Sequence, residues 1–153
     1  MVGFGEENKI CKMKPYIYLS HTADAKFRAF GANLDEAFAN AAYAMTDVIT
    51  DHKKIKAKVK EKISAKSEDE KALLYDFLEK FLILLDTKKF LLSKVNNIKI
   101  KKEKKGFSLS AEVSGDNHTE NYEIRTAIKA VTYQEMDIKK EKGKVTLQVV
   151  VDI

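Results

Sequence analysis

The chain has 153 residues, of which 44% are hydrophobic and 33% are charged, and it carries a formal net charge of +5. A chain of this length suits one domain with a real core, because it buries roughly 70% of the surface that its unfolded form exposes. The excess of basic over acidic residues suits an acidic or nucleic-acid partner, although a lysine-rich surface also keeps a protein solvated without any partner. The single cysteine, Cys11, excludes an internal disulfide framework and fits a reducing cytosol.

The beginning of the chain does not have the pattern of a targeting segment. Residues 1–12 contain two glycines and mixed charges but no apolar core of a signal peptide. No apolar run approaches the roughly 20 residues that a membrane-spanning helix needs. We therefore expect a cytoplasmic protein with a flexible extension at 1–12 and a single domain at 13–153, where no repeat, linker or low-complexity tract interrupts the pattern.

The first predicted elements are two short strands and a helix. Apolar, aromatic-rich runs predict strands at Tyr16–Leu19 and Ala25–Phe30, on either side of a short turn. Asn33, with Glu36 three positions later, resembles a capping box, in which side chains bond the free amides of a helix start. Apolar residues then recur at helical spacing, so we predict a helix from Leu34 to about Ile49.

The next segment changes from a helical to an alternating period. Lysines alternate here with mostly apolar residues, at Lys54, Lys56, Lys58, Lys60 and Lys62. Because successive side chains of a strand point to opposite faces, this pattern predicts a half-buried strand with a cationic outer face. The mutual repulsion of these lysines is tolerable only where water screens it.

A second helix and a series of strands complete the expected fold. Ser67 and Glu70 form another capping-box pattern, and the apolar residues behind it predict a central helix at about Glu68–Asp86. Alternating segments predict further strands at Val95–Lys101, Phe107–Val113, Tyr122–Tyr133, Met136–Lys139 and Lys144–Val151. The last two would form a hairpin across 141–143. These elements indicate an α+β fold, a two-layer sandwich in which a mainly antiparallel mixed sheet packs against two α-helices.

Acidic residues near the two ends of the predicted domain suggest a cation site. The last strand keeps apolar residues up to Asp152 and Ile153, so we expect the fold to hold this end. If Asp24 meets that end, two side-chain carboxylates and the terminal carboxylate supply the oxygen donors that Ca²⁺ and Mg²⁺ prefer. The alternative is that Asp24 caps a turn and Asp152 is a solvated acid without a ligand.

Other candidate residues each have a structural alternative. His21 could act as a general base or a nitrogen ligand, or only form hydrogen bonds within a turn. Asp51 follows the first helix, at an end where the helix dipole favours cations and disfavours an acid. Asp51 therefore marks either a site for a basic partner or a helix end where water screens the unfavourable charge. Lys56 and Lys58 offer a cationic contact for RNA or protein, but aromatic residues do not interleave with the lysines. The chain has no zinc-site spacing, nucleophile elbow or glycine-rich phosphate loop, which argues against those classes of enzyme.

Several motifs, taken together and in order, resemble the archease family. They are Ser-His-Thr-Ala-Asp at 20–24, the helix at 34–45, Leu-Leu-Tyr-Asp-Phe-Leu-Glu at 73–79, Thr-Ala-Ile-Lys-Ala-Val-Thr-Tyr at 126–133 and Val-Val-Val-Asp-Ile at 149–153. The match runs from Tyr16 to the end of the sequence. It departs from the family at Gln134, where a histidine often follows the Thr-Tyr pair, and in having no tryptophan in the terminal hairpin.

The resemblance implies an accessory protein rather than a free-standing enzyme. Archeases act with the GTP-dependent tRNA-splicing ligase of the RtcB type, whose guanylylation and repeated turnover they promote. The cation site of the family, usually assigned to calcium, corresponds to Asp24, Asp152 and Ile153, and Mg²⁺ or Mn²⁺ could take the same place. The implied partners are the ligase and, weakly, tRNA. Two alternatives stay open: a general chaperone or RNA-binding modulator of tRNA-processing enzymes, and a metal-dependent hydrolase that uses His21 as its base.

Overall fold

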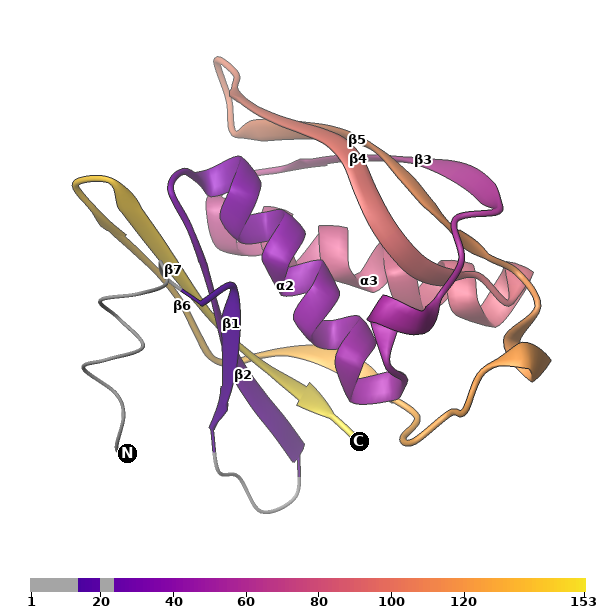
Figure 1. Ribbon diagram of the computed structural model, residues 1–153. Helices are drawn as coiled ribbons and strands as arrows, with labels where there is room; N and C mark the ends of the chain where they lie inside the picture. The colour runs from indigo at the N-terminus through magenta and orange to yellow at the C-terminus, as the bar shows by residue number, and fades with distance from the viewer. Residues whose placement is uncertain (1–13, 20–23) are drawn as a thin grey trace.

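The computed structural model describes residues 14–19 and 24–153, so the expected extension at 1–12 lies outside the described residues (Figure 1). The strands are β1 (Tyr16–Leu19), β2 (Asp24–Gly31), β3 (Val59–Ser67), β4 (Leu91–Lys102), β5 (Phe107–Asp116), β6 (Ala130–Glu141) and β7 (Lys144–Asp152). The helices are α2 (Leu34–Ile49) and α3 (Glu70–Lys88), with two short 3-10 helices, η1 (His52–Lys54) and η2 (Thr119–Asn121). Among the described helices, none is long and apolar enough to cross a membrane.

The strands form two antiparallel sheets with the two long helices between them. One sheet has the order β1-β2-β7-β6 and the other β3-β5-β4, and every strand pair in the described residues is antiparallel. Figure 1 shows α2 and α3 in the angle between the four-stranded sheet at the left and the three-stranded sheet at the top. The predicted α+β sandwich is confirmed, and its strands are divided between two sheets. Two sheets are needed because apolar residues cover much of the circumference of the helices.

The core joins both sheets through the helices. The ring of Phe38 in α2 lies 5.7 Å from the ring of Phe77 in α3. Val113 of β5 and residues 149–151 of β7, one group from each sheet, are fully buried. Because burial of each such side chain contributes about 1.5–3 kcal/mol, the core fixes β7 almost to its last residue.

The N-terminal ends of α2 and α3 show which residues cap the two helices. Asn33 caps α2 as predicted, because its side-chain oxygen accepts a hydrogen bond from the Glu36 N–H at 2.9 Å. The prediction that Ser67 begins the second helix is wrong. The cap of α3 is Asp69, whose carboxylate accepts a backbone N–H of the first turn at 2.8 Å. Ser67 still ends β3, and its hydroxyl donates to Asp76 at 2.6 Å, so strand pairing takes precedence over the capping pattern.

The predicted lysine strand is wrong in its first half. β3 begins only at Val59, and Lys54 belongs to η1, which Asp51 caps with its side chain. Ile55 is buried against the end of α2 and the start of β4, and its carbonyl accepts a hydrogen bond from the Ser93 hydroxyl of β4, so this segment packs on α2 and β4 instead of pairing with β5. The lysines that do lie in β3 are exposed, as the alternation predicts: Lys60, Lys62 and Lys66.

The predicted strand Tyr122–Tyr133 is wrong in its first part. β6 starts at Ala130 and continues through the predicted strand Met136–Lys139, with an irregularity in its pairing with β7 between Thr132 and Asp137. The segment before β6 bonds to other parts of the fold instead of joining a ladder. The Arg125 N–H donates to the carbonyl of the last residue of α2, and the Lys129 N–H donates to the carbonyl of Asp152, both at 2.7 Å.

The predicted hairpin between the last two strands is confirmed. β6 and β7 pair antiparallel with Glu141 opposite Lys144. Gly143 in the turn has a φ of 74°, a conformation that glycine adopts without steric cost. The hairpin returns β7 along β2, so that the last residue of β7 lies beside the first residue of β2.

Candidate functional site

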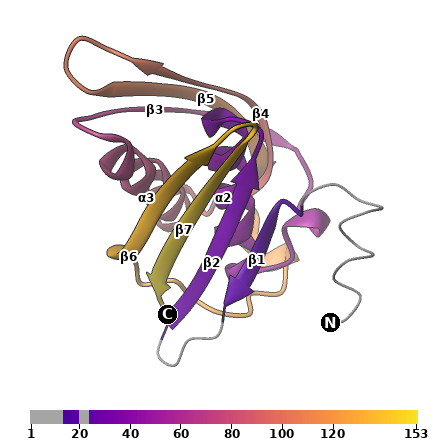
Figure 2. The same ribbon diagram turned by 90° about the vertical axis from the view of Figure 1, so that its left-hand side faces the viewer.

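The acidic end of the four-stranded sheet consists of the first residue of β2 and the last residue of β7. Asp24 and Asp152 are register partners, directly opposite each other in the antiparallel pair. Figure 2 shows the C-terminal end of the chain beside the start of β2. On the other side of β7, Ala130 pairs with Asp152, and the Lys129 N–H donates to the Asp152 carbonyl. The end of β7 is therefore held from both sides, while Asp152 itself stays exposed.

This acidic end has the donor chemistry of a site for a hard cation. Residues directly opposite in an antiparallel pair have Cβ atoms about 5 Å apart on one face, so both carboxylates can reach one ion. Like charges in such a pair destabilise a sheet, and a divalent cation between them removes the repulsion. Within 14–19 and 24–153, His, Cys, Asp and Glu side chains form no group of three or more suited to a metal ion. Asp24 and Asp152 would therefore need further oxygen donors, of which the Ile153 carboxylate is the expected one.

Two of the three predicted ligands are thus neighbours, and the third follows them in the chain. Ile153 is 39% exposed and comes directly after the paired end of β7. His21, the other residue predicted for this region, lies outside the described residues. The geometry of this end fits the oxygen-donor site that the sequence predicts, and the cation itself stays a prediction.

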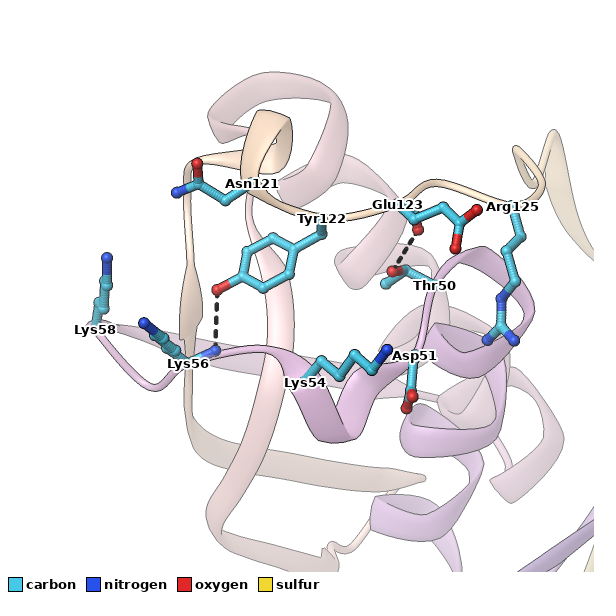
Figure 3. A pocket seen from close by; sticks show the side chains of 9 residues that line it. All are labelled: Thr50, Asp51, Lys54, Lys56, Lys58, Asn121, Tyr122, Glu123 and Arg125. Atoms are coloured by element: carbon cyan, nitrogen blue, oxygen red, sulfur yellow. Dashed lines mark hydrogen bonds between the residues drawn. The ribbon is translucent and has the colours of Figure 1, made fainter.

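A second candidate site is a pocket of about 520 Å³ between two segments that are far apart in the sequence (Figure 3). It is lined by Thr50, Asp51, Lys54, Lys56, Lys58, Asn121, Tyr122, Glu123 and Arg125. Three residues that the sequence predicts for partner binding, Asp51, Lys56 and Lys58, therefore lie around one cavity. Sequence reasoning missed Tyr122 and Arg125, because no local pattern links them to the lysines.

Hydrogen bonds between the two segments fix the walls of this pocket. The Thr50 hydroxyl donates to the Glu123 carbonyl at 2.7 Å, as Figure 3 shows. The Lys56 N–H donates to the Tyr122 hydroxyl at 3.1 Å, the second bond drawn there. The Arg125 N–H donates to the last carbonyl of α2. Because each bond involves a main-chain atom, the bonds hold the backbones of the two segments in place. The cavity between the segments therefore exists without a bound ligand.

A buried acid anchors Tyr122 behind the pocket. Asp116 is 0% exposed and accepts hydrogen bonds from the Tyr122 hydroxyl at 2.7 Å and from the His118 N–H at 3.2 Å. The bond from Tyr122, helped by those from His118, holds the pKa of the Asp116 carboxyl below its usual range although burial opposes this shift. Burial and the bond to Asp116 raise the pKa of Tyr122, so the hydroxyl stays protonated. The Tyr122 ring is therefore fixed by an ionised carboxylate.

The acids at the end of α2 have structural roles. The last turn of α2 contains no basic residue, and the Arg125 guanidinium supplies the cation by donating to the Asp47 carbonyl. The Asp47 carboxylate accepts hydrogen bonds from the Tyr16 hydroxyl and the His52 N–H. Burial, together with the bond to Asp47, raises the pKa of Tyr16. Asp51 caps η1, so this residue has a structural role whether or not it also binds a partner.

The fold defines a class of α+β sandwiches with two antiparallel sheets, and comparison with known proteins identifies the family within it. A family profile described as "Archease protein family (MTH1598/TM1083)" matches residues 16–153. The chain is 38% identical over 141 residues to the protein archease of Methanosarcina mazei, which covers 92% of this chain and 97% of that protein. It is also 38% identical over 141 residues to the protein archease of Methanothermobacter thermautotrophicus, covering 92% of this chain and all (100%) of that protein. The chain therefore belongs to the archease family.

Two solved structures share the fold. The solution structure of Methanobacterium thermoautotrophicum protein 1598 gives a TM-score of 0.82 at 38% identity, covering 92% of this chain and 100% of that one. A crystal structure of an archease from Thermotoga maritima, described as a possible chaperone, gives a TM-score of 0.52 at 17% identity, covering 94% and 98% of the two chains. At this lower identity the second likeness shows the fold alone.

Proposed function

We propose that this protein is an accessory activator of the GTP-dependent tRNA-splicing ligase of the RtcB type, rather than a free-standing enzyme. Membership of the archease family supports the proposal. The observation that carries it is the pairing of Asp24 with Asp152 at the end of the four-stranded sheet. A rigid end that is rich in oxygen donors suits a contact, through a cation, with the phosphate chemistry of a partner. We expect the protein to promote guanylylation of the ligase and so to allow its repeated turnover.

The cation that we propose at this end is divalent, with Ca²⁺ expected first and Mg²⁺ or Mn²⁺ sharing its oxygen chemistry. Asp24 and Asp152 would hold it, with the Ile153 carboxylate as the third donor. When bound, such an ion would neutralise charge during nucleotidyl transfer or shape the docking surface. The contribution of the chain itself is to hold two carboxylates at a fixed separation, because β7 is paired with β2 and β6 on both sides of Asp152.

Multiple-turnover ligation by the cognate tRNA ligase tests the proposed function. With this protein added, each ligase molecule is expected to complete several ligations, and the guanylylated fraction of the ligase is expected to rise. The ligase alone, or with an equal amount of an unrelated basic protein, is expected to slow after its first round. If product yield and guanylylation stay unchanged up to an excess of this protein, the proposal is wrong.

A second candidate function, modulation of tRNA-processing enzymes by direct RNA contact, is favoured by the outer face of the three-stranded sheet. Exposed lysines lie along both outer strands of this face, at Lys60, Lys62 and Lys66 of β3 and Lys94, Lys99 and Lys101 of β4. Ser108 of the central strand β5 has Lys66 and Lys101 as its two register partners. Register partners share one face, so two rows of lysines flank the central strand, with Glu112 of that strand and the Glu103 carboxylate, which accepts a hydrogen bond from Ser108, among them. Such a face suits the phosphate backbone of RNA.

Replacing Lys62 and Lys66 by Gln is expected to weaken RNA binding and to lower the slope of log affinity against log salt by about 1 to 2. The slope changes because each lost phosphate contact removes roughly 0.7–0.9 from it. Fluorescence anisotropy with labelled tRNA at several salt concentrations measures this slope. Replacing Lys139 and Lys142 by Gln removes the same charge from the β6–β7 hairpin and is the control. A slope lowered equally by both pairs would show that no particular face binds RNA.

A further inference from the structure

We propose that the pocket between 50–58 and 121–125 is a binding site for a phosphate group, carried either by a free nucleotide or by the end of an RNA chain. The pocket takes no part in the cation site proposed for the acidic sheet end, since the residues of the two sites do not overlap. Its volume of about 520 Å³ lies in the range of small-molecule sites, roughly 300–1,000 Å³. A phosphate ligand in this pocket would be separate from the proposed activation of the tRNA ligase.

The charges that line the pocket match those of a phosphate monoester. Four cationic side chains stand against two anionic ones, Asp51 and Glu123, which leaves a formal charge of +2. A terminal phosphate carries about −1.5 to −2 near neutral pH, so one such group balances the pocket. Figure 3 shows Lys56 and Lys58 at one end of the pocket, Arg125 at the other and Lys54 between them. Lysine ammonium groups bind phosphate as point charges, and arginine offers a planar fork of donors.

The cations of this pocket are available to a ligand. In the part of the chain that the structure describes, the ammonium groups of Lys54, Lys56 and Lys58 make no ion pair within 4.0 Å and no side-chain hydrogen bond, although the charge of Lys58 helps to lower the pKa of the buried Asp116. By contrast, Arg125 uses one nitrogen on the Asp47 carbonyl, which positions its guanidinium at the pocket and leaves other N–H donors. Like charges held together in this way repel one another, and a bound anion removes the repulsion.

The walls of the pocket are formed in advance, which favours a small anion over an extended one. The Thr50–Glu123 and Lys56–Tyr122 hydrogen bonds close the space between the two segments. These bonds preorganise the backbone of the two segments, while each lysine side chain that binds a ligand still loses rotamer freedom. The two acids among the lining residues would repel an acidic peptide running across the pocket, whereas one compact phosphate can be surrounded by the lysines and the arginine. The ligand class that fits best is therefore a single phosphate-bearing group.

Titration with inorganic tripolyphosphate at 0.15 M salt, followed by NMR amide shifts and calorimetry, tests the proposal on the isolated protein. The amides of Lys56 and Tyr122 are expected to shift first. Replacing Lys56 and Lys58 by Gln is expected to weaken binding at least about tenfold, since charge-assisted hydrogen bonds are lost. Replacing Lys139 and Lys142 by Gln removes equal charge from the β6–β7 hairpin and is expected to change the affinity less than about twofold, because salt screens charges beyond roughly 8 Å.

Three outcomes would overturn the proposal: no binding of tripolyphosphate, equal losses in the two double variants, or tighter binding of an oligo-aspartate peptide than of tripolyphosphate. Two further arms separate the sources of phosphate. Adenosine monophosphate stands for a free nucleotide, and a short RNA with a 5′-phosphate is compared with the same RNA ending in a 5′-hydroxyl. A gain in RNA affinity from the 5′-phosphate that disappears in the Lys56 and Lys58 variant identifies the RNA end. Because no ligase is present, failure here leaves the proposed activator function untouched.

Discussion

Calcium at about 100 times its dissociation constant is expected to raise the thermal unfolding midpoint of the native protein by roughly 5–10 °C, and Asp152→Asn is expected to lose this shift. A ligand that binds only the folded state stabilises it by about 2.7 kcal/mol at that ratio. For a domain of this size, 1 kcal/mol corresponds to roughly 2–4 °C in the midpoint. Calorimetry in calcium and in EDTA measures the shift directly, and Asp24→Asn is expected to behave in the same way.

The same two variants are expected to lose stimulation of the tRNA ligase in multiple-turnover ligation. Asp137→Asn is the matched control, because Asp137 is an exposed acid of the same sheet whose register partner is Gln148 rather than another acid. It should keep both the calcium shift and the stimulation. If Asp152→Asn also keeps both, the acidic sheet end is not the functional site. If it keeps the calcium shift but loses stimulation, Asp152 contacts the ligase and the cation lies elsewhere.

Stability in EDTA separates a functional role of Asp152 from a structural one. Opposed like charges in a sheet cost about 0.2–1 kcal/mol, so removing one of them should leave the free energy of unfolding within about 1 kcal/mol of the native value. Asp152 is exposed and ends its strand, and its main-chain bond to Lys129 survives the substitution. A variant that folds normally and fails only with calcium and ligase would point to the site itself.

Elements whose signals are local could be predicted from the sequence. The bounds of α2 agree with the predicted Leu34–Ile49, because the Asn33 cap and the apolar spacing both lie within the helix or next to it. β1 and the β6–β7 hairpin were predictable for the same reason. The predictions fail where tertiary contacts compete with a local pattern. Lysines 54–58 alternate as a strand would, but burial of Ile55 and the cap at Asp51 set that segment apart.

The two candidate sites differ in how far the sequence could lead to them. The apolar end of the last strand and the family resemblance both link Asp24 to Asp152, and the strand register places the two residues opposite each other. The pocket could not be predicted, because its walls come from segments whose bonding residues, Thr50 and Glu123, are 73 positions apart. The segment that contributes Tyr122 has the composition of a strand, so its sequence does not reveal that it forms a wall.

Asp116→Ala is expected to destabilise the protein by about 3 kcal/mol at pH 7, the largest loss that we predict from one polar side chain. The substitution removes a fully buried carboxylate and leaves the Tyr122 hydroxyl and the His118 N–H without their acceptor. Urea unfolding measures the loss. Glu120→Ala, which removes an exposed acid of the neighbouring η2, is the control and should stay within about 0.5 kcal/mol.

The stability difference between the native protein and Asp116→Ala is expected to depend on pH, because the pKa of Asp116 is lowered in the fold. A carboxyl whose pKa is lower in the folded state stabilises the fold fully above its unfolded pKa, about 3.9, and loses this contribution as the pH falls through the folded pKa. The gap between native protein and Asp116→Ala should therefore be widest near neutral pH and narrow in acid below about pH 4. A gap that stays constant from pH 7 to pH 2 would mean that the pKa of the Asp116 carboxyl is the same in the folded and unfolded states, contrary to this prediction.

Tyr122→Phe connects this buried acid to the phosphate pocket. The substitution keeps the ring but removes the hydroxyl that joins Asp116 to the Lys56 N–H, so it is expected to cost about 1–2 kcal/mol of stability. It changes no charge in the pocket. If the wall must be held for phosphate to bind, tripolyphosphate affinity should fall in this folded variant as well. If affinity stays at the native value, the lysines bind phosphate through charge alone, and the Asp116–Tyr122 pair serves only the stability of the fold.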